Sequence, residues 1–148
     1  MILNDVLLAL VDLFEGAVAA PVYDGPVPAA VNNGDFVLVG STGEDEDGAA
    51  LDLELSEMGP GTWLNEAGEV VCSFWSWTGG NDLPARRAAA SALATACAAA
   101  VAADRTLGGL LVAPGLAEVS TIRYQPRQTS DGAICRFTFS VLYRHVNT

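Results

Sequence analysis

Hydrophobic positions near the start of the chain recur at steps of three and four residues. They run from Leu3 to Val18, and acidic residues occupy several of the positions between them. This spacing is typical of an amphipathic helix that buries one face. We expect the helix to end at Gly16 or in the proline-rich segment that follows.

The next pattern is that of a connector followed by a short strand. Residues 21–33 are rich in proline, which disfavours helix at the preceding residue, so this segment is expected to be extended, with Tyr23 able to reach a sheet edge. Residues 35–40 form an apolar run that predicts a buried strand. Residues 41–48 then read as a loop.

Two further strands are predicted before the middle of the chain. Leucine alternates with acidic residues over 51–55, which indicates a strand with one solvated face. Residues 58–68, around Trp63, read as a loop because they contain glycine and proline. Residues 69–78 are dense in Val, Phe and Trp, which predicts a long strand packed on both faces.

An alanine-rich segment at residues 85–103 predicts the second helix. Asn81 or Asp82 can cap it, and Pro84 suits its first turn. An alanine-lined helix can lie close to a sheet, so we place this one centrally. The expected core contacts, at four-residue spacing, are Leu93, Cys97 and Val101.

Three strands are expected after this helix, at residues 110–113, 118–125 and 133–146. The last two form a hairpin around an Asp-Gly turn at 129–132. In the final strand, one face is expected to carry Cys135, Phe137, Phe139, Val141 and Tyr143, and the other Arg136, Thr138, Ser140 and Arg144.

The order of these elements predicts an α+β fold. It consists of a mostly antiparallel mixed sheet, with a short N-terminal helix and a central alanine-rich helix packed on it. A length of 148 residues with 51% hydrophobic residues fits a single domain over 1–148.

Charge is divided unevenly along the chain. The net charge is −11; residues 1–82 hold 15 of the 18 acidic residues, and residues 83–148 hold all seven arginines. This balance argues against a protein that wraps nucleic acid by neutralising phosphates. It leaves two surfaces of opposite sign for protein partners or for copies of the same chain.

The cysteines and the apolar segments bear on the compartment. Cys72, Cys97 and Cys135 match no metal-binding spacing, and we interpret them as reduced core residues of an intracellular protein. The first 20 residues resemble a signal peptide but lack a basic start and contain acidic residues, so secretion is not expected. The alanine-rich segment is too short and too weakly apolar for a membrane anchor.

Candidate catalytic and metal sites are weak. Gly43, Asp45, Asp47, Gly48 and Glu54 match part of a calcium loop, but the first position lacks a side-chain oxygen, so a solvated acidic loop is favoured. No motif places a nucleophile beside the only histidine, His145, although Ser140 and Cys135 are not excluded by sequence distance. The chain has no lysine for a P-loop or a Schiff base. We therefore expect no enzymatic activity, no metal and no cofactor.

Aromatic and basic residues indicate a protein interface. Trp75 and Trp77 lie two apart on one strand face, where packing beneath the alanine-rich helix is the first interpretation and a subunit interface the second. The arginines in or beside the last hairpin form a predicted basic surface suited to an acidic protein. They are Arg123, Arg127, Arg136 and Arg144.

The whole pattern resembles the tail terminator family of long-tailed, non-contractile (siphovirus) phages. The resemblance rests on the order of elements over nearly the full chain and on three stretches of sequence. These are Asn-Asp-Leu-Pro before the central helix, Ile-Arg-Tyr-Gln-Pro-Arg at 122–127 and Ile-Cys-Arg-Phe-Thr-Phe-Ser-Val-Leu-Tyr-Arg at 134–144.

The resemblance implies a structural virion protein located at the neck of the tail and assembled in the host cytoplasm. It implies a homohexameric ring that caps the tail tube, stops its polymerisation and offers the head-attachment surface. The implied partners are the major tail tube protein and head-tail connector or stopper proteins, with DNA passing through the lumen without specific binding. The alternatives are another neck or tail-completion component or, in a different class, a small ligand-binding or enzymatic α+β domain.

Under this hypothesis, we expect two groups of residues to lie at the lumen and at the subunit or tube interface. The acidic loop residues Glu44, Asp45, Glu46 and Asp47 are expected to line or rim the lumen, because a channel for DNA must not hold phosphates. The subunit or tube interface is expected to include Trp75, Trp77 and the four arginines of the basic surface.

Overall fold

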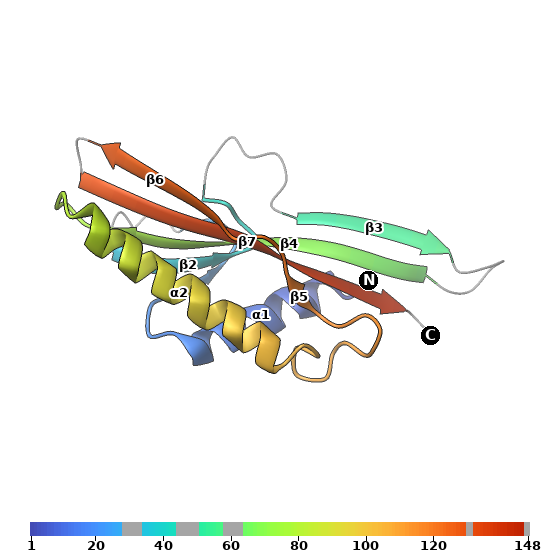
Figure 1. Cartoon of the computed structure of the whole chain (residues 1–148). Coiled ribbons are helices and arrows are strands. Elements are labelled where there is room, and N and C mark those ends of the chain that lie inside the picture. The colour runs from blue at the N-terminus through green and yellow to red at the C-terminus, as the bar shows by residue number, and fades with distance from the viewer. Residues whose placement is uncertain (28–33, 44–50, 58–63, 130–131, 147–148) are drawn as a thin grey trace.

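A computed structural model describes residues 1–27, 34–43, 51–57, 64–129 and 132–146 (Figure 1). It contains two helices and a seven-stranded mixed sheet, which confirms the predicted α+β fold. Among the described strands, Val22–Asp24 and Gly34–Val39 pair in parallel, and the other strand pairs are antiparallel. In chain order the elements are α1 (Leu3–Ala17), β1 (Val22–Asp24), β2 (Gly34–Val39), β3 (Leu51–Glu57), β4 (Leu64–Trp77), α2 (Leu83–Ala103), β5 (Glu118–Val119), β6 (Arg123–Thr129) and β7 (Gly132–Val146).

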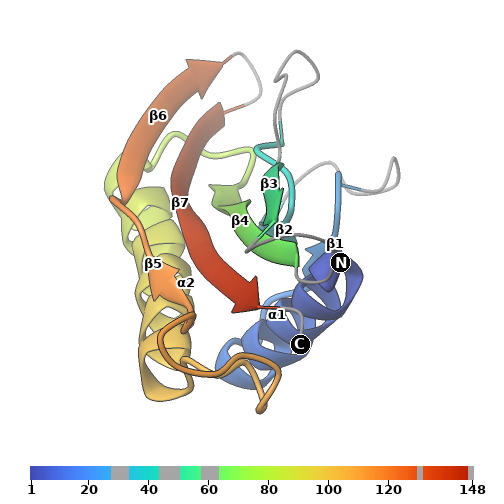
Figure 2. The same ribbon diagram turned by 90° about the vertical axis from the view of Figure 1, so that its right-hand side faces the viewer.

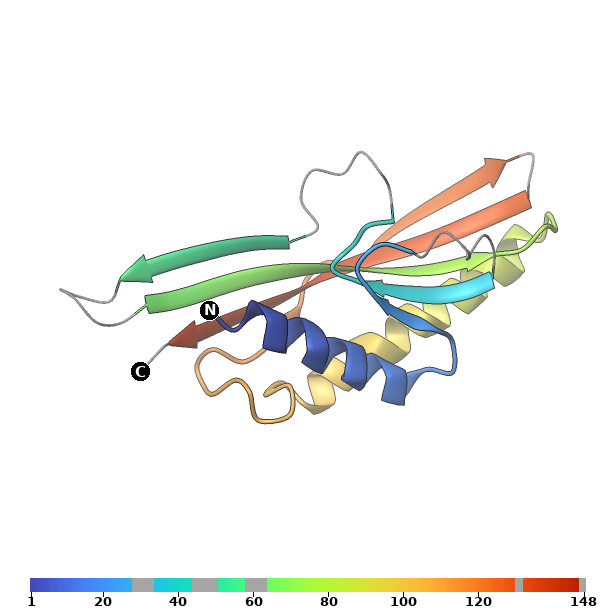
Figure 3. The same cartoon turned by 180° about the vertical axis from the view of Figure 1, so that it is seen from behind.

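Strands β4 and β7 form the centre of the sheet. They pair along almost their whole length, from Asn65 opposite Val146 to Trp77 opposite Ile134. The free side of β4 is divided between β3 and β2, and the free side of β7 between β5 and β6. As a result, β3 and β6 lie on opposite sides of the central pair and toward opposite ends of it (Figures 1 and 3).

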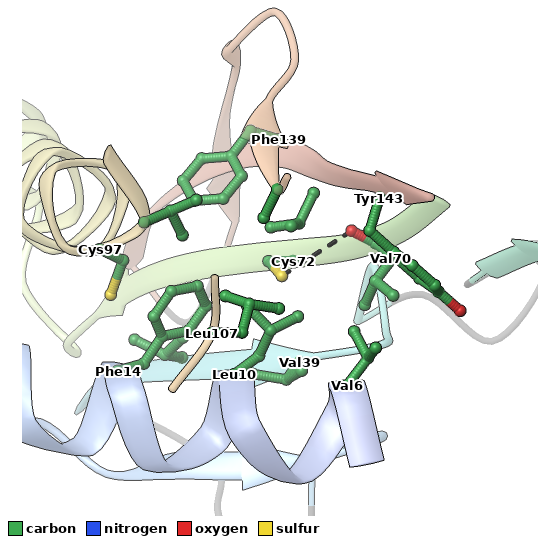
Figure 4. Packing of buried hydrophobic residues seen from close by; sticks show 14 of the residues in the cluster. Val6, Leu10, Phe14, Val39, Val70, Cys72, Cys97, Leu107, Phe139 and Tyr143 are labelled. Carbon is green, nitrogen blue, oxygen red and sulfur yellow. Dashed lines mark hydrogen bonds between the residues drawn. The ribbon is translucent and has the colours of Figure 1, made fainter. Parts of the chain in front are cut away.

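Both helices cover the same face of the sheet (Figure 2). Helix α1 buries Val6, Leu10 and Phe14, in agreement with its predicted periodicity. The centre of the core is aromatic: the ring of Phe74 lies 4.7 Å from that of Phe139 and 6.1 Å from that of Phe14, measured between centroids. Figure 4 shows Phe14 and Phe139 in this core. Aromatic pairs at these separations contribute beyond the apolar area they bury.

Helix α2 begins as predicted. The Asp82 carboxylate accepts a hydrogen bond from the Ala85 amide at 3.1 Å, and proline occupies the first turn. Cys97 and Val101 are buried as expected, whereas Leu93 is only half-buried. The other two buried positions of the helix are alanines, Ala90 and Ala94, which let it lie close to β4 and β7.

A buried carboxylate anchors the start of α1. Glu66 of β4 is 3% exposed and accepts hydrogen bonds from the Ile2 amide at 3.2 Å and the Tyr143 hydroxyl at 2.9 Å. The N-terminal ammonium lies 3.9 Å from the same carboxylate. Burial, together with Glu66, raises the pKa of Tyr143 above its ordinary value. The hydroxyl therefore stays protonated and donates a hydrogen bond to Glu66.

Replacing Tyr143 with phenylalanine tests this anchor. The variant removes one donor from a buried carboxylate, so we expect the free energy of unfolding to fall by about 1–3 kcal/mol. Urea denaturation of wild type, Tyr143→Phe and the control Tyr23→Phe measures the change. A loss no larger than that of the half-buried control would show that the hydroxyl does not stabilise Glu66.

The connector is extended as predicted, and Tyr23 lies in β1, an edge strand that pairs with β2. Three other predictions about the strands are wrong. Residues 64–68, expected in a loop, begin β4; the rest of that loop, including Trp63, lies outside the described residues. Residues 110–113 form turns instead of a strand, and the strand expected at 118–125 is divided into β5 and β6.

Local contacts explain the last two differences. Leu107 and the two glycines after it have positive φ, and Leu111 closes a turn onto the Thr106 carbonyl at 2.8 Å. Ser120 divides the longer segment, because the Ser140 amide donates to the Ser120 hydroxyl oxygen at 2.8 Å in place of a main-chain carbonyl.

Candidate interaction surface on the helix-free face of the sheet

Strand alternation gives the sheet a second face, opposite the helices, which we call the open face. As predicted for β7, Phe139, Val141 and Tyr143 point to the helix side and Arg136 to the other. The open face is lined by side chains from six strands. Those that form the candidate surface are Phe36 and Leu38 of β2, Glu54 of β3, Glu69, Ser73 and Trp75 of β4, Glu118 of β5, Arg123 and Arg127 of β6, and Arg136, Thr138 and Ser140 of β7.

Trp75 is at the centre of a stack on the open face. Its ring is nearly parallel to that of Phe36, with centroids 5.7 Å apart, and the Arg136 guanidinium carbon lies 5.3 Å from its centroid. The indole nitrogen donates to the Ser73 hydroxyl at 3.0 Å. Gly43 lies so close to the ring that a Cβ there would collide with it.

The expectation that Trp75 packs beneath the alanine-rich helix is therefore wrong. Trp75 lies on the face of the sheet that the helices do not cover, and strand alternation places the half-buried Trp77 on the same face. The helix side of β4 instead carries Val70, Cys72 and Phe74. These smaller side chains fit between the sheet and the closely packed α2.

Arg136 is part of this stack. Its side chain is 7% exposed, and Nη1 donates to the Thr42 carbonyl at 2.8 Å. The cation-π contact and the hydrogen bond offset the cost of burying the charge. Arg136 therefore supports the open face from within and holds the segment around Thr42, rather than standing on the surface as a free basic group.

The remaining predicted arginines divide between the two ends of the open face. Arg123 and Arg127 are exposed on β6, opposite Thr138 and Ile134 of β7. Arg144 is exposed near the other end of β7, opposite Ala67 of β4. The four arginines thus do not form one continuous patch.

Carboxylates gather at the Arg144 end. Glu54, Glu69 and Glu118 line a hollow of about 560 Å³ together with Arg144. A second hollow of about 500 Å³ continues toward Arg123 and is lined mainly by polar side chains. The open face therefore has an acidic end, defined by the three glutamates, and a basic end, defined by Arg123 and Arg127.

The acidic loop predicted to line a lumen, Glu44, Asp45, Glu46 and Asp47, lies outside the described residues. The described chain before it ends at Gly43, against Trp75 on the open face.

The strand geometry separates the residues considered for a catalytic triad. Cys135 lies ten residues before His145 on the extended strand β7, a distance of about 33 Å. Ser140 lies five residues before His145, so its side chain points to the opposite face. In the described part of the chain, no three His, Cys, Asp or Glu residues come together as a metal site.

The cysteines are free and buried, as predicted. Burial raises the pKa of Cys97 to about 12 and also raises that of Cys72, whose thiol donates to the Val70 carbonyl at 3.9 Å (Figure 4). A thiol with such a pKa carries almost no thiolate at neutral pH, so these side chains act as core residues.

Sequence reasoning missed Phe36 as the partner of Trp75 and missed the acidic end of the open face. Neither residue set is contiguous in sequence: Phe36 and Trp75 come from β2 and β4, and the three glutamates come from β3, β4 and β5, which are brought together by strand pairing. The alternation of β4 required Trp75 and Val70 to point in opposite directions but did not show which of them faces the helices.

No protein-family model matches the sequence, and no curated protein matches it significantly. In the described residues, neither helix is both long and apolar enough to cross a bilayer.

Proposed function

We propose that the chain is a tail terminator of a long-tailed, non-contractile phage. It forms a hexameric ring that caps the tail tube, stops tube polymerisation and provides the surface to which the head attaches. The observation that carries this proposal is the division of the open face into an acidic and a basic end on a single subunit. The sequence resemblance supplies the ring and its place in the virion.

This charge division suits a closed ring. In a head-to-tail ring, every subunit uses two different surfaces, and each contact joins the first surface of one copy to the second surface of the next. A basic end with Arg123 and an acidic end with Glu54, Glu69 and Glu118 form such a pair. Opposite potentials also favour the correct register over like-charged contacts.

The remaining partners follow from the same proposal. The tail tube protein contacts one side of the ring and a head-tail connector or stopper protein the other, and DNA passes through the lumen. The net charge of −11 supports passage without specific binding, because an acidic wall repels phosphates. The loop Glu44 to Asp47 keeps its proposed place at the lumen, and Trp75, Trp77 and Arg136 act by shaping the open face.

Disruption of the coding sequence in the phage or prophage that carries it tests the proposal. A tube that has lost its terminator continues to polymerise, so we expect tails of variable, excessive length without heads in negative-stain electron micrographs. Supplying the intact chain from a plasmid should restore tails of uniform length with heads attached. Tails of normal length joined to heads in the disrupted phage would contradict the proposal.

A further inference from the structure

Four described strands pair along one side only: β1, β3, β5 and β6, of which β3 and β6 are the longest. Strand β6 pairs only with β7, and strand β3 only with β4, among the residues that the structure describes. Each is seven residues long, and they border the sheet on opposite sides (Figures 1 and 3). A strand with one free side can pair with a strand of another chain.

The two strands have opposite charge. Strand β6 contains two arginines and no acidic residue, whereas β3 contains three acidic residues and no arginine. Arg123 through Gln128 are all exposed on β6, and Glu54 is exposed on β3. By register, Arg123 and Glu54 lie on the same side of the sheet, the open face.

Strand direction is also compatible with pairing between copies. Across the sheet in the order β3, β4, β7, β6, each neighbouring pair is antiparallel. If a second copy follows in the same orientation, its β3 lies next to β6 of the first copy and runs in the opposite direction. The antiparallel alternation therefore continues from copy to copy, and the open faces form one surface.

The two free strands are staggered along the central pair. Arg123 at the start of β6 lies opposite Thr138, whereas Glu54 in the middle of β3 is in line with Ala67 and Arg144. Thr138 and Arg144 are six residues apart on β7, a separation of about 20 Å. Tilted strands with a fixed stagger are what closure of a sheet into a ring requires.

We propose that β6 of one copy pairs antiparallel with β3 of the next, with Arg123 beside Glu54. This inference rests on the proposed ring and identifies its subunit contact. Pro126 removes one main-chain donor from β6, so the contact relies on the remaining main-chain groups and on the charged side chains. The charged side chains then select the acidic edge of a second copy as the partner.

Charge reversal tests this contact. Arg123→Glu and Glu54→Arg each place like charges across the contact, so each should weaken assembly by about tenfold or more. The double variant Arg123→Glu/Glu54→Arg should recover to within about threefold of wild type. Glu15→Arg on the exposed face of α1 is the matched control and should leave assembly unchanged. Sedimentation velocity measures the association, and thermal unfolding confirms that every variant is folded.

Cross-linking provides an independent readout. Arg123→Cys/Glu54→Cys should give a ladder up to the hexamer on non-reducing gels after mild oxidation, while either single variant should not. The native cysteines are buried and do not interfere in the folded protein. Rings that form without this ladder, or a double charge variant that stays dissociated, would overturn the contact and leave the proposed function intact. Wild-type protein that never associates would also overturn it, and the tail-length experiment then decides the proposed function separately.

Discussion

Phe74→Ala is expected to lower the free energy of unfolding by about 3–5 kcal/mol. Phe74 is fully buried, and its ring packs against both Phe14 of α1 and Phe139 of β7. Its removal leaves a cavity at the meeting point of helix and sheet, where the packed neighbours collapse only partially.

Chemical denaturation with circular dichroism measures this loss. Phe74→Leu keeps most of the apolar volume and should cost clearly less, and Leu8→Ala, at an exposed position of α1, should stay within about 0.5 kcal/mol. Equal effects of Phe74→Ala and Leu8→Ala would show that the aromatic cluster is not the centre of the core.

Gly68→Ala is the second substitution with a large expected effect. Gly68 lies directly opposite Tyr143, whose buried ring occupies the space that a Cβ would need. The ring cannot move freely, because its hydroxyl donates to Glu66. We expect a loss of about 3 kcal/mol or more in the free energy of unfolding, at the upper end of the range for an overpacked core.

Two comparisons identify the cause of that loss. Gly79→Ala, where a Cβ meets open space, should change stability by no more than about 0.5 kcal/mol. In a Tyr143→Leu background, which removes the ring, Gly68→Ala should cost much less than in wild type. An unchanged cost in that background would attribute the loss to the backbone of β4 rather than to the ring.

Gly68 also shows why part of the sheet was not predictable. A glycine in a segment with other turn residues indicates a loop, but here it lies within a 14-residue strand and makes room for a side chain 75 positions later. Helices α1 and α2 were predictable because their periodicity, capping residue and first-turn proline are local signals. The apolar residues 110–113 were wrongly predicted as a strand, because an apolar run does not distinguish a strand from a buried turn. Leu111 is buried as part of a turn and has no strand partner among the described residues.

The face of the sheet on which the tryptophans lie also depends on contacts between residues that are far apart in sequence. Alternation along β4 placed Trp75 and Trp77 on one face, but both faces of this strand carry apolar residues, so the pattern does not identify the helix side. The large indole of Trp75 instead packs with Phe36, Arg136 and the Gly43 backbone.

The distribution of charge changes most between sequence and structure. Along the sequence, acidic and basic residues separate into two halves. In the fold, Glu118 from the second half joins Glu54 and Glu69 from the first at one end of the open face, and Arg144 lies among them. The separation that remains is between the two ends of one sheet, which is the arrangement a repeating contact between identical subunits can use.

The native mass of the purified chain tests the central claim most directly. Native mass spectrometry at low ionic strength should find an assembly of about 92 kDa, six times the 15.3 kDa chain, and electron micrographs of it should show rings with an open centre. A twelve-fold assembly would instead support a connector at the portal. Protein that remains a monomer at high concentration, with or without tail tubes, would contradict the ring.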